Sequence, residues 1–296
     1  MSVQPTSNSK DRRRVSKPTD LNLKDISSRI PSRLHEPNTL WGLSYFVRDI
    51  ACVVVFWTLG TQVDPFFKYL RTSGFLHPVA ARFGIWVSWW FIGLAMMALW
   101  VLGHECGHRA FSSSRWICDI VGYFSHSFTG MPYFSWKITH HVHHSFHGSF
   151  ERDAHHIPKM RADLGIPSEA PGKTINYMEY LEDTPFYTIA MLMIHQFIGF
   201  PLYIATNLGG QKHFPSGTSH YNLNATALFK PNQKWAVLAS DMGILLVITA
   251  CFFYSRVYGW PTVFKYYIIP WLGANHWIMV IVFLQAWTYT RGAHAP

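Results

Sequence analysis

Charged residues are scarce in this chain. Only 14% of its 296 residues are Asp, Glu, Lys or Arg, whereas 49% are hydrophobic and 17% are aromatic. An ordinary soluble domain carries about 25% charged residues. The shortage of charge therefore excludes an ordinary soluble protein. It favours a chain embedded in a membrane, with Trp and Tyr residues in the interfacial belts.

Acidic residues are scarcer than basic ones, 16 against 25, and the formal net charge is +9. A basic excess can indicate nucleic-acid binding, but these residues are dispersed and no nucleic-acid-binding motif accompanies them. Attraction to an anionic cytoplasmic leaflet explains the balance better. Residues 1–40 are polar and rich in Ser, Lys and Arg, without the apolar core of a signal peptide. They are expected to form a disordered, basic cytosolic tail.

The chain also lacks paired cysteines, an internal repeat and a second soluble domain. Its four cysteines form no Cys-x-x-Cys motif, so nothing indicates a disulfide framework. What the chain does have is long apolar runs, over residues 45–63, 83–102, 236–254 and 262–285. Each approaches the roughly 20 residues that a membrane-spanning helix needs.

Turn signals between the runs indicate how they are connected. Ser73-Gly74 lies between the first two runs, and Gly259-Trp260-Pro261 lies between the last two. The expected fold is an all-α polytopic membrane protein with two transmembrane hairpins, about four spans, over residues 41–285. A fifth run, 186–206, is interrupted by Pro201 and could span the membrane or lie in its interface as an amphipathic helix. The interfacial placement is preferred.

Two histidine-rich boxes follow the first hairpin and are expected to form a helical cap on its cytosolic side. His104 and His108 are four residues apart, and His140, His143 and His144 repeat this helical spacing. Residues at such spacings share one face of a helix. A neutral imidazole is a good ligand for iron, copper or zinc. The five histidines are therefore predicted metal ligands, whereas isolated ones, such as His126 and His220, are expected to be structural or exposed.

The identity of the metal depends on how many ligands the boxes supply. His104-Glu105-x-x-His108 has the form of a zinc-protease motif, in which the glutamate is the general base. A zinc protease needs only one further ligand, so the second box would have no purpose. Non-haem iron sites with open positions activate dioxygen. Oxidation of an unactivated methylene group requires such a metal, because side-chain acid–base chemistry cannot perform it.

At these residues the chain resembles the membrane fatty acid desaturases, specifically the fungal and plant acyl-lipid type that acts at the Δ12 or ω3 position. The resemblance runs from about Tyr45 to Gln285. It is carried by Gly103–Ser112, by Pro132–Trp136 leading into the second box, by Asp183–Tyr187, by Phe200–Tyr203 and by Asn275–Trp277.

The resemblance implies an endoplasmic-reticulum membrane enzyme with a di-iron centre and with its N-terminus and histidine boxes in the cytosol. Such an enzyme would use O2 and electrons from cytochrome b5 and its reductase to introduce a cis double bond into an acyl lipid. No haem-binding His-Pro-Gly-Gly motif is present in the sequence, so no fused cytochrome domain is expected. A hydroxylase or an acetylenase on the same scaffold is the nearest alternative.

The chain departs from the family pattern after Gln285. The family has a third H-x2-H-H box well after the fourth span, whereas residues 286–296 form an atypical tail whose only histidine is His294. This departure predicts a truncation or a frameshift after Gln285. It also predicts that the chain as printed lacks ligands for two irons, which leaves a catalytically dead membrane protein as a further alternative.

Overall fold

The computed structural model describes residues 23–31, 33, 36–147, 149–154, 157 and 185–293, with the side chains of 23, 26, 187 and 285–293 left out. The chain divides into two units, residues 1–36 and 37–296. The first unit contains the short helix α1 (Leu23–Ser28), which the sequence analysis did not predict. Residues 1–22 of the predicted disordered tail and His294 lie outside the described residues.

Every regular element in the described ranges is a helix, which confirms the predicted all-α class. In the second unit these helices are α2 (Thr39–Gly60), α3 (Val63–Thr72), α4 (Pro78–Gly107), α5 (Arg115–Phe128), α6 (Tyr133–Phe146), α8 (Pro185–Thr206), η3 (Pro231–Gln233), α9 (Lys234–Tyr258), α10 (Trp260–Val263), η4 (Phe264–Ile268) and α11 (Ile269–Ala293).

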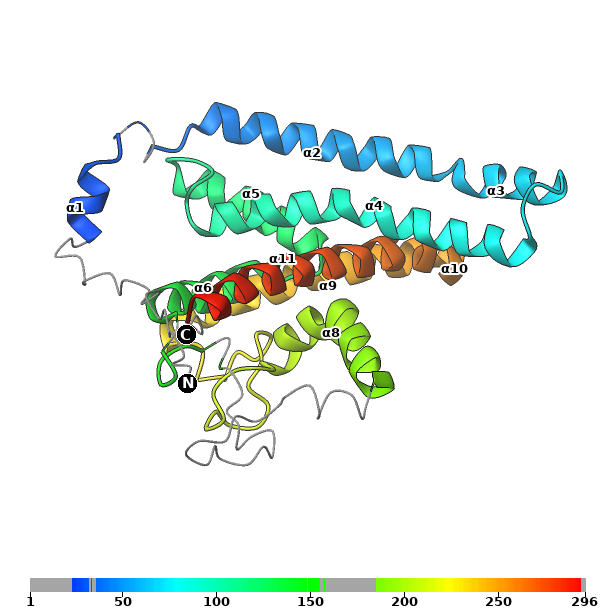
Figure 1. The fold of residues 1–296 in the computed structure, drawn as a ribbon. Helices are drawn as coiled ribbons and strands as arrows, with labels where there is room; N and C mark the ends of the chain where they lie inside the picture. The colour runs from blue at the N-terminus through cyan, green and yellow to red at the C-terminus, as the bar shows by residue number, and fades with distance from the viewer. Residues whose placement is uncertain are drawn as a thin grey trace, which may run out of the picture. The chain divides into compact units, whose positions relative to one another are not determined.

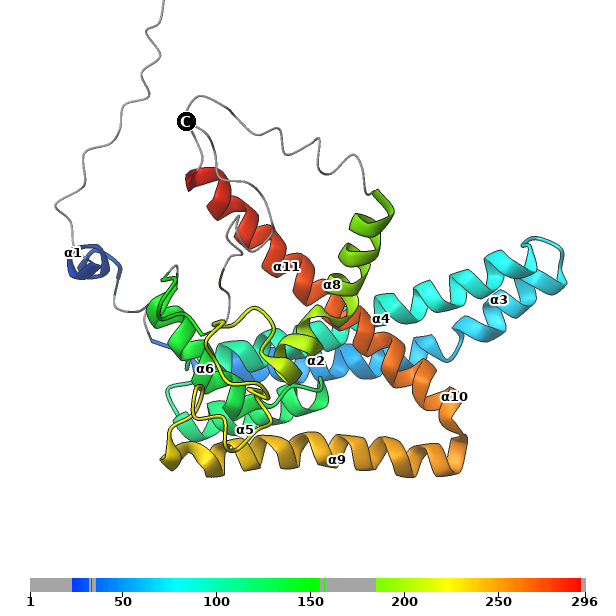
Figure 2. The ribbon, with the colours of Figure 1, turned by 90° about the horizontal axis from the view of Figure 1, so that it is seen from below.

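The long helices form two hairpins whose open ends face the same way. Helix α2 continues through α3 to a turn, from which α4 runs back. Helix α9 turns at α10, and α11 returns in the same manner (Figures 1 and 2). Helices α5 and α6 lie at the end where α4 finishes and α9 begins. The first histidine box therefore lies at the end of α4 itself, and only α5 separates it from the second box on α6.

Among the described residues, five helical segments are long and apolar enough to cross a membrane: Thr39–Thr72, Pro78–Gly107, Thr188–Thr206, Pro231–Tyr258 and Trp260–Leu284. Three of them contain the predicted runs 45–63, 83–102 and 236–254, and a fourth covers all but the last residue of 262–285. The additional one belongs to α8, so length and composition alone do not separate a spanning from an interfacial placement for this helix. Its Pro201 lies inside the helix.

Local capping explains why the helices are longer than the apolar runs. The Asn38 side chain accepts hydrogen bonds from the backbone N–H groups of Leu40 and Trp41, so α2 starts six residues before the predicted run. At α4, His77 caps the helix and Pro78 occupies its first turn. Capping residues accept hydrogen bonds from the free N–H groups at the start of a helix. Because these residues are polar, a search for apolar runs does not detect them.

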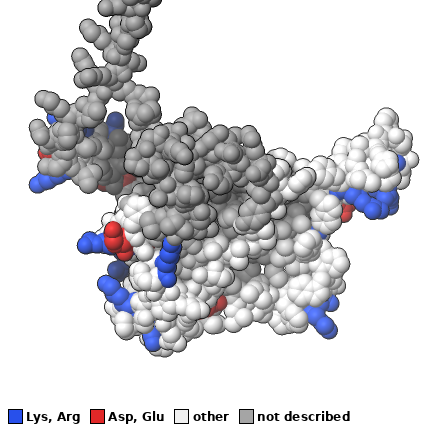
Figure 3. Space-filling view, turned by 60° about the horizontal axis from the view of Figure 1, so that its bottom comes forward, with Lys and Arg blue, Asp and Glu red and all other residues white. Residues whose placement is uncertain are grey.

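The surface of the hairpins has the character expected of a membrane protein. Large apolar side chains are exposed on several helices, among them Val54 (58%), Phe83 (70%) and Leu246 (62%). In Figure 3, Lys and Arg gather toward the two ends of the described surface and leave a band between them that is almost free of charge. Lipid tails solvate such a surface as readily as apolar side chains do.

Glycines hold the two hairpins together. A Cβ atom at Gly93 of α4 would lie 2.3 Å from the carbonyl oxygen of Pro270, and one at Gly273 of α11 would lie 2.2 Å from that of Trp90. The two helix backbones are therefore in direct contact. Small residues are typical of such contacts in membranes, where association depends on packing instead of on the hydrophobic effect.

Candidate metal centre

The first histidine box forms the last turn of α4. Thirty residues at about 1.5 Å each give α4 a length of about 45 Å, against about 30 Å for the hydrocarbon core of a bilayer. This excess allows the turn that carries His104 to lie outside the hydrocarbon. His108 caps the helix, and the next residue, Arg109, has a left-handed backbone with φ of 61°. The chain thus leaves the helix directly after the second histidine.

The second box lies on α6, which contacts both hairpins. Ser240 of α9 accepts hydrogen bonds from the backbone N–H groups of Phe134 and Ser135, at 2.9 and 3.1 Å, and so caps the start of α6. Trp136 packs against Gly107 at the end of α4, where a Cβ atom would lie 2.8 Å from the indole ring. These contacts set the second box against the first.

Four histidines from the two boxes converge on one point. The Nε2 atom of His140 lies 3.0 Å from that of His104, 3.1 Å from that of His108 and 3.1 Å from that of His144. The Nε2 atoms of His104 and His108 are 3.3 Å apart. All four ligand nitrogens lie within 4.8 Å of one another.

Hydrogen bonding among the rings cannot account for this arrangement. Each neutral imidazole nitrogen is either a donor or an acceptor. The Nε2 atoms of His104, His108 and His140 form three short pairs. At least one of these pairs must therefore consist of two donors or two acceptors, which cannot form a hydrogen bond. Two ligands at about 2.1 Å from one ion, about 90–110° apart, lie about 3.0–3.4 Å from each other. The donor set therefore fits a single transition-metal ion.

The protonation states also suit a metal. The Nδ1 atom of His104 lies 3.1 Å from a carboxylate oxygen of Glu105, which favours the tautomer that leaves Nε2 with a lone pair. Burial, with a smaller contribution from His104, lowers the pKa of His108 to about 4. Burial also lowers the pKa of His144. Neutral imidazole is the form that binds metals.

His143 does not join this cluster. Its Nδ1 atom lies 2.9 and 2.8 Å from the two carboxylate oxygens of Asp153, and with His147 these residues form a second group of possible metal ligands. The His143 ring is 5.8 Å from that of His144. The structure thus divides the five predicted ligands into four and one, although helical spacing placed all five on one face.

Asp153 and His147 were not predicted from the sequence. Asp153 is 2% exposed, and Gln211 donates a hydrogen bond to its backbone carbonyl. A carboxylate ten residues after His143 follows no ligand-spacing rule, and a loop separates the two residues. The only signal in the sequence was an acidic residue shortly after a histidine box.

Aromatic and polar side chains support the cluster from behind. The ring of Trp136 stacks on that of His140, with centroids 4.3 Å apart. His126 is fully buried, its Nε2 atom lies 3.1 Å from the Trp100 carbonyl oxygen, and burial lowers its pKa to about 3. His220 is also fully buried and contacts the Thr139 hydroxyl at 3.1 Å. Both isolated histidines are structural, as predicted.

Comparison with known proteins agrees with this geometry. The model of the fatty acid desaturase family matches residues 82–295, a range that includes both boxes and runs into the tail after Gln285. The chain belongs to the fatty acid desaturase family. This family of oxidoreductases is the one that the chain was expected to belong to by resemblance, so the zinc-protease alternative is dropped.

Several curated relatives resemble this desaturase-family protein over most of its length. It is 32% identical to an oleate hydroxylase of Claviceps purpurea over 93% of the chain, and it spans 61% of that protein. It is 31% identical to a Δ12 fatty acid desaturase of Mortierella isabellina over 93% of the chain and 70% of the relative. An endoplasmic-reticulum ω-6 desaturase of Brassica juncea is 30% identical, over 92% of the chain and 68% of the relative.

Proposed function

We propose that this protein acts as an acyl-lipid desaturase that introduces a cis double bond at the Δ12 or ω3 position of a membrane lipid. Iron is the proposed metal, O2 the oxidant, and cytochrome b5 with its reductase the source of electrons. Convergence of four imidazole nitrogens at the end of a membrane helix is the observation that carries the proposal. Names of relatives from fungi and plants support the same reaction class.

The residues of the chain have distinct proposed roles. His104, His108, His140 and His144 would hold one iron, while His143, oriented by Asp153, would face a second one. Bound iron would supply the activation of O2 that removal of hydrogen from a methylene group requires. Glu105 keeps the His104 tautomer suited to ligation. The hairpins would admit the acyl chain from the bilayer.

The five box histidines do not provide a full ligand set for two irons. His294 is the only histidine after Gln285. A centre that activates O2 must hold both metals at a fixed separation and leave positions open, which requires ligands from several helices. We therefore expect the 296-residue polypeptide, expressed by itself, to enter membranes without desaturating lipids.

Hydroxylation is the second candidate, because one of the relatives is an oleate hydroxylase with 32% identity. Hydroxylation and desaturation start from the same hydrogen removal and differ in what becomes of the carbon radical. An acetylenase would use the same scaffold. Small differences in the position of the acyl chain relative to the metals would separate these outcomes.

Fatty-acid profiling tests the reaction. The printed chain, and a version extended by a C-terminal segment that carries an H-x2-H-H box, are expressed in a host that lacks polyunsaturated lipids. New linoleate or α-linolenate from the extended version alone supports the proposal, and hydroxylated acyl chains support the alternative. Double bonds made by the printed chain, with two irons per polypeptide, would show that its own residues suffice.

The proposed topology places the N-terminus and both boxes on the cytosolic side of the endoplasmic reticulum. Single cysteines at the exposed positions Ser113 and Ser73 mark the two ends of the first hairpin. Labelling by a membrane-impermeant reagent from the cytosol should reach Ser113→Cys and not Ser73→Cys. The reverse pattern would contradict the topology. Background from the native cysteines is low because Cys106 and Cys118 are buried, and Cys52 and Cys251 lie within candidate membrane spans.

A further inference from the structure

A cavity of about 930 Å³ lies on the face of α6 next to the one that carries the histidine cluster. Three segments far apart in the sequence form its walls: the turn after α4, helix α6, and residues 226–236 at the start of α9. Its apolar lining includes Phe134, Ile138, Leu228 and Phe229. The volume is typical of a site for a small ligand. Nothing in the proposed reaction uses this cavity.

The polar lining of the cavity is positive. Arg109, Lys137 and Lys230 line it, and no acidic residue is among the described residues that do. Lys137 is neutralised by Asp119, whose carboxylate accepts a hydrogen bond from it at 2.5 Å. Arg109 and Lys230 are exposed, and neither forms an ion pair within the part of the chain that the structure describes. Two positive charges are thus available beside an apolar floor.

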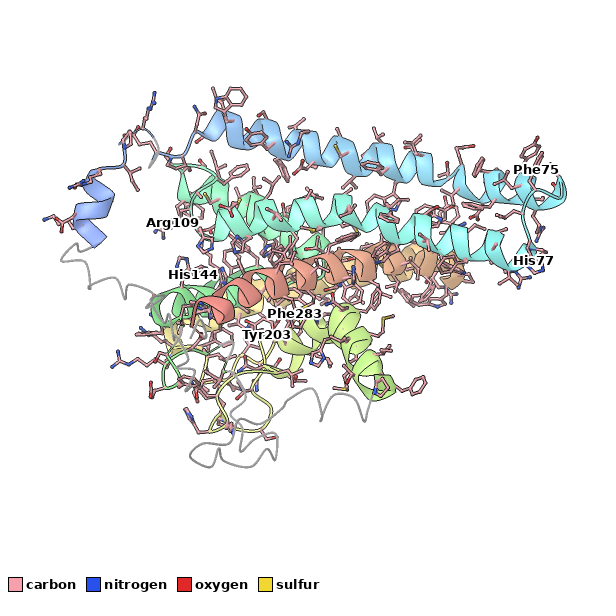
Figure 4. The ribbon with its side chains drawn as sticks, viewed as in Figure 1. Phe75, His77, Arg109, His144, Tyr203 and Phe283 are labelled. Atoms are coloured by element: carbon pink, nitrogen blue, oxygen red, sulfur yellow. The ribbon has the colours of Figure 1, made fainter. Side chains whose placement is uncertain are left out.

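Arg109 has a backbone conformation that is unusual for its residue type. Its φ of 61° lies in the left-handed region, which glycine adopts without strain and which ends many helices. Here the N–H of Arg109 donates to the Cys106 carbonyl at 3.1 Å, and that of Ala110 donates to the Glu105 carbonyl at 3.0 Å. A large residue in this position points to a use for its side chain. Figure 4 shows Arg109 and His144 at the same end of the helices.

The cavity lies where a membrane span begins. The apolar segment Pro231–Tyr258 starts at its wall, and Trp235 in the first turn of α9 is 79% exposed. Exposed tryptophans at the ends of spans mark the depth of the lipid head groups. A ligand in the cavity would therefore have access to the head-group layer and, through the apolar floor, to the acyl region.

We propose that this cavity binds an anionic membrane phospholipid, with its phosphate at Arg109 and Lys230 and its upper acyl chain on the apolar floor. A phosphate carries the charge that the two free cations require, and a concave apolar floor suits a lipid chain better than the flat surface of a protein partner. His141 lies between the site and the cluster, because it lines the cavity and its ring centroid is 6.1 Å from that of His108. Only the further step, that the bound lipid is the substrate, rests on the proposed function.

Equilibrium binding to the purified chain in detergent tests the site without any turnover. The probes are dihexanoyl phosphatidylglycerol, dihexanoyl phosphatidylcholine, dihexanoylglycerol and inorganic phosphate, each titrated by calorimetry. Phosphatidylglycerol should bind most tightly, since it alone combines net negative charge with acyl chains. Inorganic phosphate that binds as tightly would overturn the assignment to a lipid, and uncharged dihexanoylglycerol that does so would overturn the role of the cations.

Matched variants locate the binding. Arg109→Gly and Lys230→Ala should each weaken phosphatidylglycerol binding about fivefold, and Arg109→Gly should not lower the melting temperature because glycine relieves the strained backbone. Lys234→Ala removes the same charge four residues from Lys230, outside the cavity lining, and should leave binding unchanged. Equal losses in all three variants would indicate a diffuse charge effect and overturn the site. Unchanged binding in Arg109→Gly and Lys230→Ala would overturn it as well.

Discussion

Helices α4 and α11 meet through bare backbone, whereas the region around the histidines is held by buried polar side chains. At the first contact, Gly93 lies against Pro270 and Ala274. In the cap, which we define as α5, α6 and residues 207–230, fully buried side chains include His126, Ser135 and His220. At this contact the hairpins use small residues, whereas the cap buries polar side chains.

The difference follows from the solvent around each region. Lipid offers no gain for burying apolar side chains, so contacts between the hairpins depend on close packing. The cap lies beside the polar boxes, and the buried His126 and His220 each use Nε2 in a hydrogen bond, as buried polar groups usually do. His104 and His140 come from different helices. Their positions depend on the close contact between α4 and α11 and on the hydrogen bonds of the cap.

The largest effect is expected from breaking the contact between the hairpins. Gly93→Leu would drive a side chain into the backbone of α11, where three backbone atoms lie 2.3–2.9 Å from the Cβ position and cannot rotate away. We expect the free energy of unfolding to fall by several kcal/mol, or the protein not to fold at all. Overpacking against backbone costs more than the usual figure of about 1–3 kcal/mol. Thermal unfolding and size-exclusion chromatography in detergent measure it.

The neighbouring residue provides the control for this substitution. Leu94 is 42% exposed on the hairpin surface. Leu94→Ala should change the melting temperature little, because lipid or detergent replaces the lost contacts. If Leu94→Ala and Gly93→Leu were equally disruptive, the account of glycine-mediated packing would be wrong.

The next effect is expected in the cluster itself. His140→Ala removes the nitrogen that lies within 3.1 Å of three others, and iron affinity should fall by more than about 100-fold, beyond the loss usual for supporting residues. His141→Ala changes the adjacent histidine, which bonds to the Gly107 carbonyl oxygen. It should retain iron. Iron per polypeptide, measured after dialysis, distinguishes the two, and equal losses would contradict the assignment.

A smaller effect is expected at Asp153. Asp153→Asn keeps an acceptor for the Nδ1–H of His143 but removes the charge, and supporting residues of this kind cost about 10–100-fold in metal affinity. Competition with a chelator of known affinity measures the change. Glu151→Gln, an exposed carboxylate two residues earlier, is the matched control. A loss confined to Glu151→Gln would refute the role of Asp153.

The smallest effect is expected in the network behind the cluster. Thr139→Val removes a hydroxyl that lies 3.1 Å from the Nε2 atom of His220 and keeps the shape of the side chain. Loss of one buried hydrogen bond costs about 1 kcal/mol, which corresponds to a few degrees in melting temperature. Iron affinity should be unchanged. A large loss of iron in this variant would mean that the network positions His140 directly.

The sequence by itself determined the elements of this protein. Length and hydrophobicity located the apolar runs, because a membrane requires about 20 apolar residues in a helix whatever its neighbours are. Helical spacing placed His104 with His108 and His140 with His144, since periodicity is a local property of the chain. The family was indicated by resemblance over these boxes and other segments, and the comparisons confirmed it.

Only the tertiary structure decided which residues meet. The cap of α6 comes from Ser240, more than 100 residues later in the chain. His143 lies apart from the other predicted ligands because it forms a hydrogen bond with Asp153, which a loop places beside it. Arg109 and Lys230 line the same cavity, although they are far apart in the sequence and no local pattern predicts that they are neighbours. Periodicity fixes the direction of a side chain on its own helix, whereas its partners depend on how separate helices pack, and that is a property of the whole fold.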